Sequence, residues 1–161
     1  MRLALLALVT AALVAHSAAE ASTKVPPLQR LDGAQVELPV SSAPTILLFW
    51  RSDCAPCLLE LSDLVALRAS APNARVIPVG LQAAAALRPA LARLGLRADD
   101  TLRTTEDPAR LLVRLGGAPP RLPLAVAFRK GGELCGRHSG LLGRDQVRAW
   151  AQACGDVHVG R

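Results

Sequence analysis

The sequence predicts one α/β domain, in which helices flank a mixed central sheet that begins with an N-terminal β-hairpin. Short apolar runs alternate with helical patterns along the chain, and a second hairpin and a helix follow at the end. The 161 residues suffice for one domain with a sizeable core but not for two of ordinary size. Because 51% of the residues are hydrophobic and only 2% aromatic, that core must consist of Leu, Val, Ala and Ile.

The first part of the domain contains a hairpin, a buried strand and a helix in succession. Asp32-Gly33 separates two short segments, which is typical of a hairpin turn. Residues 44–50 (PTILLFW) form a continuous apolar run whose length and flanking turn residues favour a buried central strand. A helix is predicted from Pro56, since proline suits the first turn. Its residues at helical spacing are Leu58, Leu61, Leu64, Val65 and Arg68.

The middle of the chain repeats the alternation of strand and helix. Residues 74–82 predict a second buried strand, although Pro78 lies in its centre. Residues 83–96 are helical in composition, and Pro89 should kink or split this helix. A short strand is predicted within residues 101–107 and a short helix within 108–117.

The last elements are a hairpin and a helix. Residues 124–140 predict two strands joined at a turn over residues 130–132. Residues 143–157 predict a helix with one apolar face, formed by Val147, Trp150, Ala151 and Cys154.

Residues 1–21 have the features of a signal peptide. A positive residue near the start precedes an apolar stretch over residues 3–14, and small residues then allow cleavage after Ala19 or Ala21. The stretch is shorter than the roughly 20 residues of a comfortable membrane span. An uncleaved membrane anchor is the alternative.

Residues 22–27 are polar and proline-bearing, and predict a tether or extended lead-in to a domain over residues 28–161. The domain is therefore expected in the periplasm, on the inner membrane only if the N-terminal segment stays uncleaved. The net charge of +6 does not indicate nucleic-acid binding, because the arginines are scattered and aromatic residues are scarce.

Cys54 and Cys57 lie where the predicted buried strand gives way to the predicted helix. In C-x-x-C at a helix start, the first sulfur lies over unpaired backbone N–H groups that stabilise a thiolate, and it stays accessible. The second sulfur is carried about one turn inward. Cys54 is thus the expected attacking thiol and Cys57 the resolving thiol, with no further cofactor.

Three other interpretations of this pair stay open. Cys54 and Cys57 could form a structural disulfide, or bind copper(I) in a delivery protein, because copper(I) favours thiolates. A zinc site is disfavoured, since zinc normally takes four ligands and the other two cysteines are distant singletons, so no metal ligands are assigned. Peroxide reduction is weakened because Arg51 stands three residues before Cys54, where peroxiredoxins carry a hydroxyl residue.

Several motifs together resemble one protein family. The order of the Asp32-Gly33 hairpin, a strand ending in Phe49-Trp50, C-x-P-C and an amphipathic helix is similar to the thioredoxin superfamily. More narrowly, it resembles the exported TlpA/ResA-type thiol–disulfide oxidoreductases, which include reductants of cytochrome c maturation. Glu60 and the segment GGAPPRLPLAVAF extend this resemblance, which spans residues 28–153.

The resemblance implies roles for particular residues. Pro123 corresponds to a cis-proline beside the dithiol, and Leu122 would offer its backbone to an extended substrate segment. Pro120 is the competing candidate, and an ordinary trans proline is the other alternative. Glu60 would raise thiol pKa values and relay protons, whereas the simpler interpretation is a solvated surface charge. The remaining residues expected to contact substrate are Trp50, Ala55 and Pro56.

Three positions depart from the family pattern. Asp53 replaces a tryptophan before the first cysteine, and its carboxylate should oppose thiolate formation at Cys54. Leu58 replaces a basic residue and Ser62 a helix proline. These changes bear on reactivity and partner more than on the fold.

The resemblance also implies partners. It indicates a reductant for protein substrates that carry cysteine pairs, in apocytochrome c or a copper site, supplied by a membrane thiol donor. The C-x-x-C spacing itself does not fix the direction of exchange.

Cys135 and Cys154 are the two remaining cysteines, and three pairings of the four are possible. The final helix should pack across the sheet, so a structural disulfide between Cys135 and Cys154 is sterically reasonable. The alternative is two separate buried thiols.

Overall fold

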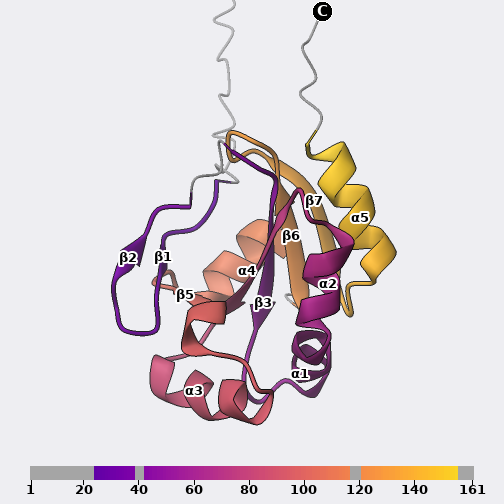
Figure 1. Cartoon of the computed structure of the whole chain (residues 1–161). Helices are drawn as coiled ribbons and strands as arrows, with labels where there is room; N and C mark the ends of the chain where they lie inside the picture. Colours follow the sequence, from indigo (N-terminus) through magenta and orange to yellow (C-terminus); the bar gives the residue numbers. More distant parts are fainter. Residues whose placement is uncertain (1–23, 39–41, 117–120, 156–161) are drawn as a thin grey trace, which may run out of the picture.

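The computed structural model describes residues 24–38, 42–116 and 121–155 (Figure 1). The predicted signal peptide, the first two residues of the predicted tether, and Pro120 lie outside the described residues. The elements are β1 (Leu28–Gln29), β2 (Gln35–Val36), β3 (Thr45–Trp50), α1 (Ala55–Ser62), α2 (Leu64–Ser70), β4 (Arg75–Gly80), α3 (Ala84–Arg93), a 3-10 turn η1 (Ala98–Asp100), β5 (Leu102–Thr104), α4 (Pro108–Gly116), β6 (Leu124–Phe128), β7 (Leu134–Ser139) and α5 (Arg144–Ala153).

The seven described strands form one mixed sheet in the order β2-β1-β5-β4-β3-β6-β7. The three strands β3, β4 and β5 run parallel, as expected where a helix connects successive strands. The two hairpins, β1–β2 and β6–β7, add antiparallel pairs toward the edges. The predicted fold class, with its N-terminal hairpin, is therefore confirmed.

Helices cover both faces of the sheet, and the two faces have separate apolar clusters. Alternate residues of β3 point to opposite faces, so Ile46 and Leu48 pack with α2 and α5, while Leu47 and Phe49 pack with α4. A third cluster lies where β3 ends and joins Trp50 to apolar residues of α1 and α3. Figure 1 shows α1 and α3 together at this end of the sheet.

The helix predicted from Pro56 to Arg68 is in fact two helices. The chain leaves α1 at Asp63, whose N–H bonds to the Glu60 carbonyl at 3.1 Å in a tightened turn. The Ser62 hydroxyl also donates to the Leu59 carbonyl at 2.7 Å, which competes with the backbone ladder. The break therefore occurs although position 62 carries Ser and not Pro.

Two internal prolines are accommodated. The sequence predicts that Pro89 kinks or splits its helix, and α3 runs through Pro89 without a split. The carbonyl that it leaves unbonded belongs to Ala85, an exposed residue that water can reach. Pro78 lies in β4, and its carbonyl accepts a hydrogen bond from the Thr101 hydroxyl at 3.0 Å, just before β5 begins to pair.

Residues 24–27 pack on the domain rather than forming a free tether. Val25 contacts the cluster under α4, Pro26 is buried, and the Lys24 carbonyl accepts a hydrogen bond from Arg114 at 3.0 Å. Among the described residues, no helix combines the length and apolar character needed to cross a membrane.

Candidate active site

The paired cysteines lie at the junction between β3 and α1, as the sequence predicts. Cys54 is the N-cap residue of α1, and a disulfide joins it to Cys57, with a Cα–Cα distance of 5.2 Å. Cys54 is half-buried, whereas Cys57 is 0% exposed. Only the first sulfur of the pair therefore belongs to a residue that an external partner can contact.

The helix N-terminus faces the outer sulfur. The backbone N–H of Cys57 points at Cys54 Sγ over a donor–acceptor distance of 3.3 Å. In the reduced protein this N–H and the positive end of the helix stabilise a thiolate at Cys54. Ala55 and Pro56 are both exposed and lie between the two cysteines, at the rim of the site.

Trp50 supports the site from beneath. It was expected to contact substrate, but it is 0% exposed, so the structure contradicts that role. Its indole Nε1 donates to the Thr101 hydroxyl at 3.1 Å, which satisfies the buried polar group. Trp50 is thus a packing residue that fixes the end of β3 under the dithiol.

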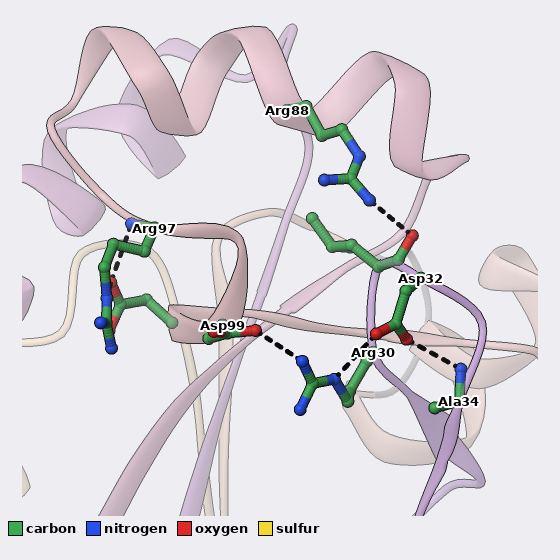
Figure 2. A network of polar contacts seen from close by, with 8 residues as sticks. Arg30, Asp32, Ala34, Arg88, Arg97 and Asp99 are labelled. Atoms are coloured by element: carbon green, nitrogen blue, oxygen red, sulfur yellow. Dashed lines mark hydrogen bonds and ion pairs between the residues drawn. The ribbon is translucent and has the colours of Figure 1, made fainter.

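The N-terminal hairpin reaches the same cluster. Leu31, at its turn, packs with Trp50 and Cys57. Figure 2 shows how the turn is fastened: Arg88 of α3 donates to the Leu31 carbonyl at 3.0 Å, and Arg30 contacts both Asp32 and Asp99. Apolar packing and exposed ion pairs together hold the hairpin turn against the floor of the site.

The Leu122–Pro123 peptide bond is cis. Leu122 is half-buried and packs on the same cluster as Cys54 and Cys57, while Pro123 is buried. The Pro123 carbonyl accepts a hydrogen bond from the Gly140 N–H at 2.8 Å, which fixes the start of β6. The dithiol and the cis-proline segment, far apart in sequence, are therefore brought together.

Glu60 is a buried carboxylate one helical turn after Cys57. It is 4% exposed, and its Oε1 accepts a hydrogen bond from the Leu142 N–H at 2.8 Å. Removal from water raises the pKa of Glu60 from its usual value near 4.5 to about 7, and the hydrogen bond from Leu142 opposes this rise. Residues three apart on a helix are neighbours, so Glu60 lies on the same side of α1 as Cys57.

Asp53 is paired rather than free. Arg51 forms two hydrogen bonds to its carboxylate, from Nε at 2.9 Å and from Nη2 at 2.8 Å. These bonds lower the pKa of Asp53 and offset its charge next to Cys54. Arg51 therefore reduces the unfavourable effect that the Asp53 carboxylate alone would have on a thiolate at Cys54.

The second disulfide lies away from this site. Cys135 of β7 and Cys154, which caps the C-terminal end of α5, are joined with a Cα–Cα distance of 5.8 Å. The residues that the structure describes contain no group of three or more His, Cys, Asp or Glu side chains placed to hold a metal ion.

Several residues near the site had no signal in the sequence. Leu142 contributes a backbone N–H, which any residue except proline would carry. The side chain of Gln82 accepts a hydrogen bond from the Ser52 N–H at 2.7 Å and so fixes the loop before Cys54. Only the Arg51-x-Asp53 spacing offered a hint of pairing.

Comparison with known proteins adds the fold relationship. No family model matches the chain, and no curated protein matches it by sequence. Solved structures do match. The chain has the thioredoxin fold. MTB DsbF, solved in mixed oxidized and reduced forms, aligns with a TM-score of 0.64 at 17% identity, over 84% of this chain and 98% of that one.

Two further thioredoxin-fold structures are similar. The exposed lipoprotein thioredoxin Etrx1 of Streptococcus pneumoniae aligns with a TM-score of 0.61 at 22% identity, over 78% of this chain and 96% of its own. StoA of Bacillus subtilis aligns with a TM-score of 0.58 at 20% identity, over 79% and 98% of the two chains. This chain therefore spans nearly the whole of each.

Proposed function

We propose that this protein is a thiol–disulfide oxidoreductase that exchanges disulfides with protein substrates through Cys54 and Cys57. The observation that carries the proposal is the asymmetry of the pair. Cys54 is accessible and faces the N–H of a helix start, while its bonded partner is fully buried. A purely structural disulfide has no need of this arrangement, whereas an attacking and a resolving thiol do.

In the reducing direction, exchange begins at Cys54. Its thiolate attacks one sulfur of a substrate disulfide and forms a mixed disulfide, and the other substrate sulfur leaves as a thiolate that takes up a proton. Cys57 then passes its proton to Glu60. The resulting thiolate attacks Cys54 Sγ, closes the Cys54–Cys57 bond and releases the second substrate thiolate. Two electrons have then moved from this protein to the substrate.

Substrate binds, in this proposal, along the segment beside the dithiol. Leu122, in front of the cis-proline, lies in the same cluster as Cys54, and Ala55 and Pro56 form the exposed rim. An extended substrate segment paired with the Leu122 backbone would present its own cysteine to Cys54.

The physiological role we propose is that of an exported reductant, acting on cysteine pairs of apocytochrome c or of a copper site and re-reduced by a membrane thiol donor. The predicted signal peptide supports export. The similar structures include a secreted disulfide oxidoreductase of Mycobacterium tuberculosis, described as homologous to E. coli DsbE, and a lipoprotein. Fractionation of cells that express the full chain tests the location.

The reduction potential of the Cys54–Cys57 couple tests the direction. It is measured by equilibrating the protein with a dithiol buffer of known potential and counting free thiols. A value near about −270 mV, as in thioredoxin, supports a reductant, whereas a value near about −120 mV, as in DsbA, reverses the proposed direction.

A second measurement tests the alternative function, copper(I) delivery by the same two sulfurs. Reduced protein is titrated with copper(I), and its exchange with a peptide disulfide is measured in parallel. Tight stoichiometric copper binding with negligible exchange would replace the oxidoreductase by a carrier.

A further inference from the structure

The loop between β7 and α5, residues 140–143, lies against the end of α1. Its Leu142 is the residue whose backbone N–H donates to Glu60 Oε1 at 2.8 Å. The Leu142 side chain is itself buried in the cluster under α2 and α5. The contact to the buried carboxyl is therefore made by a backbone group that side-chain packing holds in place.

Three further contacts hold this loop. Arg144, at the first position of α5, makes a bidentate ion pair with Asp63, with distances of 3.0 and 2.6 Å. His138 Nε2 lies 3.1 Å from the Leu141 carbonyl. The Cys135–Cys154 disulfide joins β7 to the end of α5, the two elements that the loop connects.

The surroundings of Glu60 make its hydrogen bond to the loop important. A cleft of about 390 Å³ opens beside it, lined by residues that include Leu59, Leu141 and Leu142. The titratable and charged groups on the elements that meet near Glu60 include Cys57 on its own helix, Asp63 at the α1–α2 junction, Arg144 from α5 and His138 from β7. Asp63 and Arg144 pair with each other, and the Leu142 N–H donates to the Glu60 carboxylate.

We propose that the β7–α5 loop positions Glu60 for proton exchange with Cys57, with the Leu142 N–H as the direct contact and the Arg144–Asp63 pair as the anchor of the loop. Leu142 and Arg144 are positioning residues, since they act through Glu60. The inference rests on the proposed function, in which Glu60 takes a proton from Cys57 and returns it to water. In this inference the β7–α5 loop, which is distant in sequence from the dithiol, helps to control the proton transfer between Cys57 and Glu60.

The first test removes the donor alone. Semisynthesis replaces the amide between Leu141 and Leu142 with an ester in the full chain, which keeps both side chains but eliminates the Leu142 N–H. The titration of Glu60 is followed by carbon-13 NMR of labelled glutamate in the oxidised protein, in which the cysteines do not titrate. Glu60→Gln identifies the signal, and the His138 ring is followed separately.

We expect the ester to raise the titration midpoint of Glu60 by about one pH unit, because a hydrogen bond to a charged group is lost. In the reduced protein, the pH dependence of the resolving step should move in the same direction. An unchanged midpoint in the ester protein would overturn the proposal.

The second test removes the anchor with ordinary substitutions. Arg144→Ala should shift the Glu60 midpoint in the same direction by a smaller amount, and Arg144→Lys should restore it by pairing again with Asp63. Arg148→Ala is the matched control, since Arg148 forms an exposed ion pair with Asp145 on the same helix without touching the loop. Equal shifts in Arg144→Ala and Arg148→Ala would contradict the anchoring role.

These readouts separate this inference from the proposed function. The NMR titration uses the oxidised protein and requires no exchange activity. If the titration shifts as expected but no disulfide exchange occurs, the loop positions Glu60 and the oxidoreductase proposal fails. If exchange occurs but neither variant moves the titration, the loop inference fails alone.

Discussion

The protein contains two disulfides in contrasting surroundings. Cys54–Cys57 spans three positions at the N-terminal end of α1, and one of its residues is half-exposed. Cys135–Cys154 spans 19 positions and ends at the C-terminal cap of α5, where Cys154 is 1% exposed. The same bond is therefore placed once at the positive end of a helix and once at a negative end.

This difference predicts a reactive pair at one end of a helix and a stabilising pair at another. Backbone N–H groups at a helix start stabilise a thiolate, while carbonyl groups at a helix end disfavour it. Closing a longer segment also restricts the unfolded chain more than closing a short one. We therefore expect reactivity at the first pair and a contribution to stability from the second.

The largest expected effect is on the first pair. Cys54→Ser should reduce exchange with a peptide disulfide to the background rate, because no accessible thiolate remains. Cys57→Ser should instead accumulate a mixed disulfide between Cys54 and the peptide, since the resolving sulfur is missing. Mass spectrometry detects this adduct, and its formation on Cys57 in the Cys54→Ser protein would reverse the assigned roles.

The second pair should affect stability rather than exchange. The double variant Cys135→Ala/Cys154→Ala should lose about 3 kcal/mol of unfolding free energy in the chain-entropy model. Denaturant titration of oxidised wild type and variant measures the difference. Exchange rates at a temperature where both are folded serve as the control, and a loss as large as that in Cys54→Ser would make both disulfides part of the site.

Glu60 should make the stability of the domain depend on pH. Burial raises its pKa in the folded protein to about 7 from near 4.5, so the unfolded chain releases this proton first as the pH rises. The unfolding free energy should therefore fall between about pH 4.5 and 7, by up to about 3 kcal/mol. Glu60→Gln keeps an acceptor for the Leu142 N–H and should remove this fall, which denaturant titrations at pH 4.5 and 8 would measure.

Asp32→Asn provides the control for Glu60→Gln. Asp32 is not part of the contacts that position Glu60, and the hydrogen bond from the Ala34 N–H lowers the pKa of this exposed carboxyl. Its contribution to stability is present above the unfolded pKa and is lost as the pH falls. A decrease of stability with rising pH that survives in Glu60→Gln would assign the effect to another group.

The order of elements could be predicted from sequence because it follows from local pattern. Continuous apolar runs correctly predicted β3 and β4, and the two glycine-containing turns correctly predicted both hairpins. The break between α1 and α2 depends on hydrogen bonds around Ser62 and Asp63 that periodicity does not contain. The continuity of α3 through Pro89 depends on where the unbonded carbonyl faces.

The sequence predicted which residues form the site better than it predicted what surrounds them. The C-x-x-C pattern and the resemblance led to the cysteines, Glu60 and the segment around Pro123, which the structure brings to one end of the sheet. They also led to Trp50 as a substrate contact, because sequence does not show which end of a strand is covered by a neighbouring helix. Burial, like the contact from Leu142, is a property of tertiary packing.

The smallest expected effect concerns the charge next to Cys54. Arg51→Ala would leave the Asp53 carboxylate unpaired on the residue directly before Cys54, so fewer Cys54 thiols should ionise at neutral pH. Asp53→Asn would leave the Arg51 guanidinium unpaired and should favour the thiolate. Because both side chains are exposed, we expect the exchange rate to change by only about twofold in opposite directions.

Salt provides the decisive control for this pair, since exposed charges are screened. The two variants should approach the wild-type rate in about 1 M salt, where the Debye length is about 3 Å. Asp145→Asn, which alters a similar exposed ion pair on α5, should leave the rate unchanged at every salt concentration. Rates that change in the same direction in Arg51→Ala and Asp53→Asn would mean that the pair acts by holding the shape of the loop. The contrast between the two disulfides would then depend on helix polarity and burial, without a contribution from neighbouring side-chain charge.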